Sequence, residues 1–233
     1  MPPKIKILLV DDHPLVREGV ANLINQQPDF EVCGEAASEP QALEIIGTMK
    51  PDVAVVDISL ENGSGLELIK SIKAMHPTVA MLALSMHDES LYAERALRAG
   101  ARGYIMKREA AKKVIQGIRA VLAGRLFVSE KIAALMAEKF VEGRTAASAS
   151  PVEQLSDREL EVFQLLGRGH STRQIADHLH VGFKTVQGLL RPHQGKAPAG
   201  QRHRIAARGH ALERKPAGRI ITRFFVGFRP TKH

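Results

Sequence analysis

The chain has 233 residues, of which 44% are hydrophobic, and this length suits two compact domains or one large one. No window approaches the roughly eighteen consecutive apolar residues of a membrane span, and "MPPKIKILLVDDHP" turns acidic too soon for a signal peptide. The single cysteine, Cys33, excludes an intrachain disulfide and fits a reducing compartment, so we expect a cytoplasmic protein without membrane attachment.

The net charge of +8 is distributed unevenly along the chain. Residues 1–125 carry a net charge of −1, residues 126–187 carry −1, and residues 188–233 carry +10. A basic tail of this kind can bind nucleic acid through the phosphates. Residues 1–187 are close to neutral, so the overall charge of the chain indicates nothing about the partners of these residues.

The first 125 residues alternate short apolar runs with helical periodicity. Between the runs lie amphipathic segments such as "PLVREGVANLINQQ", where Pro14 suits a first helical turn, and "SLYAERALRA", where Gly100 follows as the expected C-cap. Strands are predicted at residues 4–10, 30–36, 52–57, 79–85 and 101–107. We therefore predict an α/β domain over residues 1–125, with a doubly wound five-stranded parallel sheet and helices on both faces.

Polar residues end four of the five predicted strands. They are Asp11 and Asp12 after the first strand, Asp57 after the third, Ser85 after the fourth and Lys107 after the fifth. Ligands of such sheets bind beyond the carboxyl ends of the strands, so these side chains are expected to share one edge. Three carboxylates at one edge repel each other unless a cation holds them, and oxygen ligands suit Mg²⁺.

Each of these residues also has a simpler structural explanation when it is taken alone. Asp12 can be a helix N-cap, Ser85 can cap the helix that follows it, and Lys107 can be a solvated residue at the rim of the sheet. Taken together, the residues favour phosphoryl transfer. A carboxylate beside Mg²⁺ can attack a phosphoryl group, and Asp57 is the best placed nucleophile. Ser85 and Lys107 would then contact the transferred oxygens.

Four motifs carry a family resemblance over residues 4–123: "LLVDDHPLVREGV", "VVDISLENGSGLELI", "LALSMHDE" and "GARGYIMK". Together they resemble the flavodoxin-like receiver domain of bacterial two-component response regulators. The resemblance implies that a sensor histidine kinase phosphorylates Asp57, with Ser85 and Lys107 assisting. Two positions depart from the family pattern, Glu61 in the loop after Asp57 and Arg108 after Lys107, but neither is an expected metal ligand.

The same resemblance assigns the metal ligands and the switch. It implies Mg²⁺ bound by Asp12, Asp57 and the backbone carbonyl of Ser59, with Asp11 assisting through water. It also implies that Tyr104 is a switch residue that turns inward as Ser85 follows the phosphoryl group. Plain packing at a strand edge is the alternative explanation for Tyr104.

Residues 126–152 are predicted to connect two domains. "GRLFVSEKIAALMAEKFVEG" indicates a helix that begins at Ser129 and ends near Gly143, and "RTAASASPVEQ" is typical of a flexible tether. The folded pattern resumes with Ser156 as N-cap and Glu159 completing a capping box. Two short helical patterns then follow around a turn at Val181 and Gly182, which is the pattern of a DNA-reading unit.

"LSDRELEVFQLLGRGHSTRQIADHLHVGFKTVQ" resembles the LuxR/NarL-type helix-turn-helix, which predicts a partial, all-α domain over residues 153–187. The resemblance implies that Lys184, Thr185 and Gln187 contact DNA, that Val186 lies in the core, and that Arg173 contacts phosphate. A small helical interaction module is the alternative. Residues His170, His178 and His180 are expected to be surface residues because no second ligand group has suitable spacing for a metal.

The helical pattern stops after Gln187, although a recognition helix should continue. Residues 188–233 contain six Gly, four Pro, eight Arg and one acidic residue. They can be a disordered basic tail, or the product of GC-rich DNA read out of frame. With codons chosen freely, residues 188–212 can be back-translated so that deleting one base yields "AYCARIKEKLRLANATELLREAMR". This string is amphipathic and supplies the missing helices, so we hypothesise a one-base insertion near codon 188.

The sequence therefore predicts a response regulator that binds promoter DNA and forms a homodimer on phosphorylation through the face carrying "HDESLYAERALRAGARGYIMK". It is not expected to be an enzyme beyond its own phosphoryl transfer and dephosphorylation. The main alternative is a receiver that acts only as a protein-interaction module because its DNA-binding domain is disrupted. A small phosphatase or other hydrolase is a third possibility, but no separate base or substrate pocket is indicated.

Overall fold

The computed structural model describes residues 3–60, 63–141, 155–179 and 181–190. The chain divides into two units, Met1–Ala147 and Ser148–His233. The predicted tether and most of the predicted out-of-frame tail lie outside the described residues. Within the described residues, no helix has the length and apolar character needed to cross a membrane.

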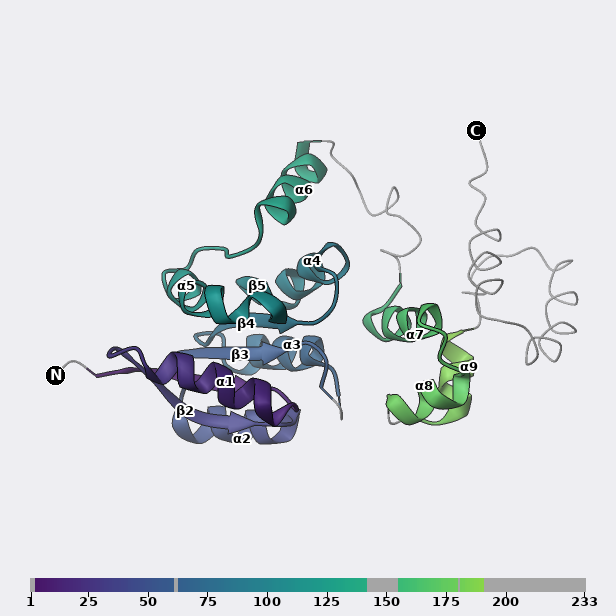
Figure 1. Ribbon diagram of the computed structural model, residues 1–233, viewed down its shortest axis with the longest axis horizontal. Coiled ribbons are helices and arrows are strands. Elements are labelled where there is room, and N and C mark those ends of the chain that lie inside the picture. Colours follow the sequence, from purple (N-terminus) through teal and green to yellow (C-terminus); the bar gives the residue numbers. More distant parts are fainter. Residues whose placement is uncertain (1–2, 61–62, 142–154, 180, 191–233) are drawn as a thin grey trace, which may run out of the picture. The chain divides into compact units, whose positions relative to one another are not determined.

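The first unit is built on a parallel sheet with the strand order β2-β1-β3-β4-β5 (Figure 1). The strands are β1 (Ile5–Val10), β2 (Phe30–Ala36), β3 (Val53–Asp57), β4 (Ala80–Ser85) and β5 (Gly103–Met106). All five lie within the predicted runs, and each neighbouring pair is parallel. The predicted α/β class with a five-stranded parallel sheet is confirmed.

Helices cover both faces of this sheet (Figure 1). They are α1 (Pro14–Asn25), α2 (Glu39–Met49), α3 (Gly65–Met75), α4 (Glu89–Ala99) and α5 (Ala110–Leu122), with a 3₁₀ turn at Lys107–Glu109 before α5. Alternate strand residues such as Ile7 and Leu9 pack in the core beneath α1 and α5. The residues between them, such as Leu8 and Val10, are equally buried, as expected of a sheet with both faces covered.

Two glycines allow the turns that bring the chain back to the sheet edge. A Cβ atom on Gly65 would lie 1.9 Å from the backbone oxygen of Asp57, so only glycine lets α3 begin this close to the end of β3. Gly100 has a φ of 132° and ends α4 as the predicted C-cap.

The segment after α5 packs on the first unit. Phe127 pairs with Gly103 at the edge of β5, and the Phe127 carbonyl accepts a 2.8 Å hydrogen bond from the Tyr104 amide. The predicted helix is present as α6 (Glu130–Val141), and the Ser129 hydroxyl accepts a 3.2 Å hydrogen bond from the Ile132 amide. The domain boundary at residue 125 stays a prediction, but these contacts extend the structured part of the unit to α6.

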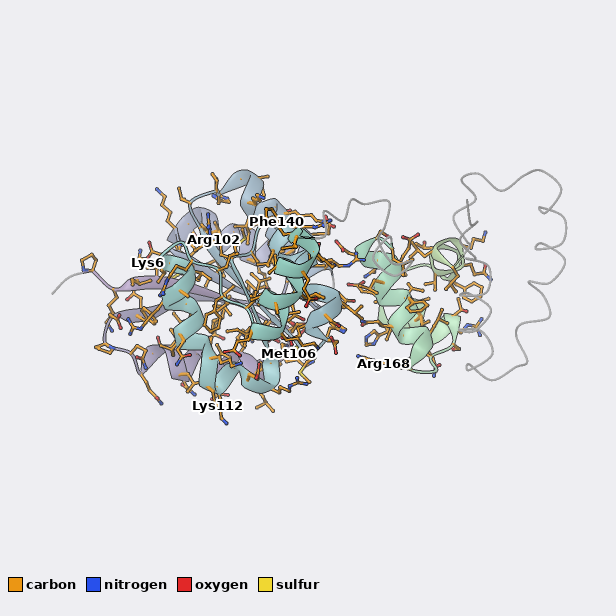
Figure 2. All side chains as sticks on the ribbon, turned by 90° about the horizontal axis from the view of Figure 1, so that it is seen from above. Lys6, Arg102, Met106, Lys112, Phe140 and Arg168 are labelled. Atoms are coloured by element: carbon orange, nitrogen blue, oxygen red, sulfur yellow. The ribbon has the colours of Figure 1, made fainter. Side chains whose placement is uncertain are left out.

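Helix α6 is held against α4 by charged and apolar contacts. Lys139 pairs with Glu94 at 2.7 Å, Lys131 lies 4.0 Å from Glu89, and Ile132 is buried. Helix α6 thus covers part of the face that was predicted to associate with a second receiver. Figure 2 shows Phe140 near the end of α6, where it is 88% exposed.

The second unit contains α7 (Asp157–Gly167), α8 (Thr172–His178) and α9 (Phe183–Leu189). The predicted capping box of Ser156 and Glu159 is present, and Ser171 and Gln174 form a second capping box that the sequence analysis missed. The core of this unit consists of Val162, Leu165, Ile175, Ala176 and Val186. The partial domain was predicted over residues 153–187, and α9 itself extends through Gly188 to Leu189.

Candidate functional site

Three of the predicted residues form a buried charged cluster at the carboxyl edge of the sheet. Lys107 Nζ lies 2.8 Å from Asp57 Oδ2 and 2.7 Å from Asp11 Oδ2. The side chain of Lys107 is 5% exposed, and Asp57 is 1% exposed. The strand ends of β1, β3 and β5 therefore bring one ammonium group between two carboxylates.

The electrostatic surroundings of Asp57 shift its pKa strongly. Burial raises the pKa of Asp57 to about 6, although the ammonium group of Lys107 lowers it. Burial also lowers the pKa of Lys107, but Asp57 and Asp11 raise it by more, so the net pKa of Lys107 lies above its ordinary value. A carboxylate that is buried yet paired with a cation is a candidate for a functional role.

The cluster also fits a divalent cation. Ligand atoms from Asp11, Asp12, His13 and Asp57 lie within 4.8 Å of one another. Asp12 Oδ1 lies 2.6 Å from His13 Nδ1, and the Ser59 amide donates a 3.2 Å hydrogen bond to Asp57 Oδ1, so the Ser59 backbone also lies beside the cluster. Carboxylate and carbonyl oxygens grouped at the mouth of a sheet are the donor set that Mg²⁺ prefers.

Ser85 and Tyr104 are both hydrogen-bonded to His87, which lies two residues after Ser85. The Ser85 hydroxyl accepts a 2.9 Å hydrogen bond from the His87 amide, and the Tyr104 hydroxyl donates a 3.0 Å hydrogen bond to the His87 carbonyl. Tyr104 is 4% exposed, and its burial raises its pKa. The Tyr104 side chain therefore points inward, toward the end of β4, in this structure.

The simpler explanations for the single residues do not hold. The N-cap residue of α1 is His13 rather than Asp12. The N-cap residue of α4 is Asp88, whose side chain accepts a hydrogen bond from the Ser90 amide, so Ser85 does not cap that helix. Lys107 is buried between two carboxylates and is not a solvated rim residue.

The sequence analysis missed two histidines beside the predicted residues. His13 contacts Asp12, and His87 contacts both Ser59 and Ser85. Their only signal in the sequence is their position, since His13 follows the acidic pair and His87 lies two residues after Ser85. A histidine within a loop matches no motif spacing, so its contacts become visible only in the folded chain.

The second unit exposes the residues that were predicted to contact DNA. Arg173 on α8 and Lys184, Thr185 and Gln187 on α9 are exposed, whereas Val186 is fully buried. Positively charged and hydrogen-bonding side chains on the exposed side of a short helix can reach base edges and phosphates. The geometry is compatible with DNA contact, and the individual contacts stay predictions.

The histidines of the second unit do not form a metal site with a third ligand among the described residues. His170 and His178 stack with their ring centroids 6.2 Å apart. His178 is exposed, as predicted for a surface residue, whereas His170 is half-buried. His180 lies outside the described residues.

Comparisons with known proteins match both units. A response regulator receiver domain matches residues 7–119, and the model of bacterial regulatory proteins of the luxR family matches residues 153–192. The oxygen regulatory protein NreC of Staphylococcus aureus is 36% identical over 187 residues, covering 78% of this chain and 86% of that protein.

Solved structures agree with these matches. A LuxR-family two-component response regulator from Aurantimonas sp. SI85-9A1 is 38% identical with a TM-score of 0.55, covering 59% of this chain and 99% of that chain. The response regulator RcsB of Salmonella typhimurium has a TM-score of 0.53 at 24% identity, covering 80% of this chain and 88% of that chain. At that identity the likeness to RcsB concerns the fold alone.

Proposed function

Because the chain belongs to the LuxR-type family of two-component response regulators, with a receiver and a DNA-binding unit, we propose that its receiver is phosphorylated on Asp57 by a sensor histidine kinase. The observation that carries this proposal is the burial of Asp57 beside Lys107 and Asp11 at the sheet edge. Members of this family regulate transcription and are not enzymes. Because transcription requires access to the chromosome, the proposed compartment is the cytoplasm.

The residues of the cluster have separate roles in the proposed reaction. A carboxylate oxygen of Asp57 attacks the phosphorus atom, and the bond between phosphorus and the donor atom breaks as the acyl phosphate forms. Lys107, 2.8 Å from Asp57, pairs with the transferred oxygens, and the Ser85 hydroxyl donates a hydrogen bond to one of them. Mg²⁺ would supply further charge neutralisation, held by Asp12, Asp57 and the Ser59 carbonyl, with Asp11 contributing through water.

Phosphorylation is expected to require a divalent cation. The full chain incubated with acetyl phosphate and Mg²⁺ should gain the mass of one phosphoryl group, and an excess of EDTA should prevent the gain. The reason is that three neighbouring carboxylates repel an incoming anionic donor unless a cation neutralises them. Intact-mass spectrometry measures the result, and restoring Mg²⁺ to the EDTA sample is the control. Equal labelling with and without Mg²⁺ would contradict the proposed metal role.

A homodimer that forms on phosphorylation is also proposed, and α6 gives a way to test which face it uses. The predicted face includes α4, whose residue Glu94 is paired with Lys139 of α6. If this face associates, α6 must leave it. Reversing the charge in Lys139→Glu should weaken the docking of α6 and shift the mass of the phosphorylated protein further toward that of a dimer.

Light scattering with and without acetyl phosphate measures this effect. Lys70→Glu is a matched control, because it breaks the exposed Lys70–Glu67 pair within α3 and leaves α6 in place. If phosphorylation leaves the mass of the wild type and of Lys139→Glu unchanged, association through this face is wrong.

A receiver that acts only as a protein-interaction module is the second candidate function. The observation that favours it is the length of α9, which has seven residues and ends at Leu189, where a strongly basic segment begins. A helix of two turns presents few side chains to a major groove. The comparison of chains described in the Discussion separates the two candidates.

A further inference from the structure

Asp11 is held at the end of β1 by contacts from four other residues. Its amide donates a 3.0 Å hydrogen bond to the Ala36 carbonyl of β2. One carboxylate oxygen accepts from the His13 amide at 2.9 Å, and the other lies 2.7 Å from Lys107 Nζ. The Asp11 carbonyl accepts a 2.6 Å hydrogen bond from Nη1 of Arg17. Every polar group of Asp11 therefore has a partner, and Arg17 is the partner that fixes its carbonyl.

Arg17 is in turn held in place by β2. It lies near the start of α1, and its Nε donates a 2.9 Å hydrogen bond to Glu35 Oε2. Glu35 immediately precedes Ala36, whose carbonyl accepts from the Asp11 amide. The donors of a guanidinium form a rigid fork, so two acceptors on different nitrogens fix both its position and its plane. The Arg17 side chain is 19% exposed, so little water competes for these donors.

The carbonyl that Arg17 binds belongs to the peptide between Asp11 and Asp12. A peptide unit is planar, and the Asp11 amide is already held by β2, so fixing this oxygen also sets the position of the Asp12 Cα atom. Asp12 is a proposed ligand of Mg²⁺, and its carboxylate lies in the same cluster as those of Asp11 and Asp57. The direction in which the Asp12 side chain leaves the backbone therefore depends on Arg17.

The contribution of Arg17 to the cluster is one of geometry more than of charge. Its guanidinium is paired with the carboxylate of Glu35, so the two side chains together are neutral. Its hydrogen bond to Asp11 goes to a backbone carbonyl and not to a carboxylate. Residues that orient metal ligands without touching the metal act mainly by keeping those ligands in place.

We propose that Arg17 is a positioning residue for the divalent cation at the sheet edge. It holds the peptide between Asp11 and Asp12 in the orientation from which Asp12 reaches the ion, and Glu35 holds Arg17. The inference rests on the proposed metal-dependent phosphorylation of Asp57. Arg17 itself contacts neither the ion nor the phosphoryl group.

Arg17→Lys is the informative substitution, because it keeps the positive charge and loses the fork. Mn²⁺, which takes the same oxygen ligands as Mg²⁺, is titrated into the unphosphorylated full chain. The electron paramagnetic resonance signal of the unbound ion gives the Kd. Arg17→Lys should bind Mn²⁺ about ten-fold more weakly than the wild type. The difference should persist at high salt, because the charge has not changed.

Arg119→Lys is the matched control for this titration. Arg119 forms the same kind of two-donor pair with Asp29, at 2.7 and 3.1 Å. Asp29 lies immediately before β2, at the opposite end of that strand from Ala36. The control therefore loses a fork of the same kind without any effect on the peptide after Asp11, and it should bind Mn²⁺ like the wild type.

Phosphorylation by acetyl phosphate gives a second readout. The concentration of Mg²⁺ that gives half of the maximal labelling rate should rise about ten-fold in Arg17→Lys, in parallel with the Kd. The rate at saturating Mg²⁺ should equal that of the wild type, because Asp57 and Lys107 are unchanged. A purely structural role would lower the melting temperature of Arg17→Lys and leave the half-saturating concentration where it is.

Glu35→Gln tests the same contact with the arginine in place, so it decides the inference if circular dichroism shows Arg17→Lys to be unfolded. It should weaken Mn²⁺ binding, but less than Arg17→Lys does. If the wild type neither binds Mn²⁺ nor takes a phosphoryl group, the proposed function and this inference both fail. If the wild type does both, but Arg17→Lys and Glu35→Gln keep its Kd, the positioning role is wrong and the proposed function stands.

Discussion

Asp57→Asn is expected to abolish phosphorylation of the full chain by acetyl phosphate. The amide of asparagine cannot act as the nucleophile. Among the described residues, the other carboxylate that contacts Lys107 is Asp11. Asp11 follows β1 and is 4% exposed, whereas Asp57 ends β3, is 1% exposed and has its pKa raised by burial to about 6. The loss should therefore be complete and not partial.

The loss of labelling should not result from unfolding. Burial raises the pKa of Asp57 to about 6, so at neutral pH the carboxylate is mostly ionised, and keeping it ionised in the folded state lowers the free energy of unfolding. Neutral asparagine removes that cost, and Lys107 keeps Asp11 as a partner at 2.7 Å. The melting temperature of Asp57→Asn should be equal to or higher than that of the wild type at neutral pH.

Asp52→Asn is the matched control, because Asp52 is an exposed carboxylate immediately before β3 and Asp57 ends the same strand. It should be labelled like the wild type. Intact-mass spectrometry, with peptide mapping of the labelled residue, measures both variants. Equal labelling of Asp57→Asn on another aspartate would show that the nucleophile is assigned wrongly.

Restoring the alternative reading frame after codon 187 is expected to convert weak, unspecific DNA binding into site-specific binding. The chain as written places a net charge of +10 in residues 188–233, which should bind any DNA through its phosphates and lose affinity steeply with salt. The restored chain gains the rest of the recognition helix and a closing helix. As a dimer it should prefer paired half-sites to random DNA by about a thousand-fold or more.

The small core and short last helix of the second unit give a physical reason for this difference between the two chains. Its described core contains five buried apolar residues, from Val162 to Val186, and its recognition helix α9 ends at Leu189. The luxR-family match ends at residue 192, close to the hypothesised insertion. An incomplete recognition helix predicts that residues 153–233 of the chain as written are largely disordered or molten, whereas α7 to α9 are folded helices in the structure. The tail beyond residue 190 lies outside the described residues.

Competition between specific and random DNA, measured across a salt series, distinguishes the chain as written from the restored chain, and circular dichroism follows the helix content of both. The specific DNA is the sequence that the restored chain selects from a random pool. A third chain that stops at Gln187 is the control, since it lacks the basic tail and should lose the salt-dependent binding of the chain as written. Site-specific binding and a cooperative melt of the second unit in the chain as written would contradict the frame hypothesis. Unspecific binding by the restored chain would instead favour the interaction module.

Local patterns in the sequence predicted the five strands and several of the helix ends. Short apolar runs predicted the strands, and residues such as Ser156 and Gly100 predicted helix ends, because such runs and helix caps depend on neighbours a few residues away. The shared sheet edge of Asp11, Asp57 and Lys107 followed from one topological rule, since parallel strands bring their carboxyl ends together.

Only the tertiary structure decided which of these residues touch and which others join them. The hydrogen bond between Lys107 and Asp57 spans 50 positions in the sequence, and that between Ser59 and His87 spans 28. The pairing of Phe127 with β5 likewise depends on the space left by Gly103. Such contacts are set by how strand ends and loops are placed against each other in the folded chain, and no pattern of neighbouring residues carries that information.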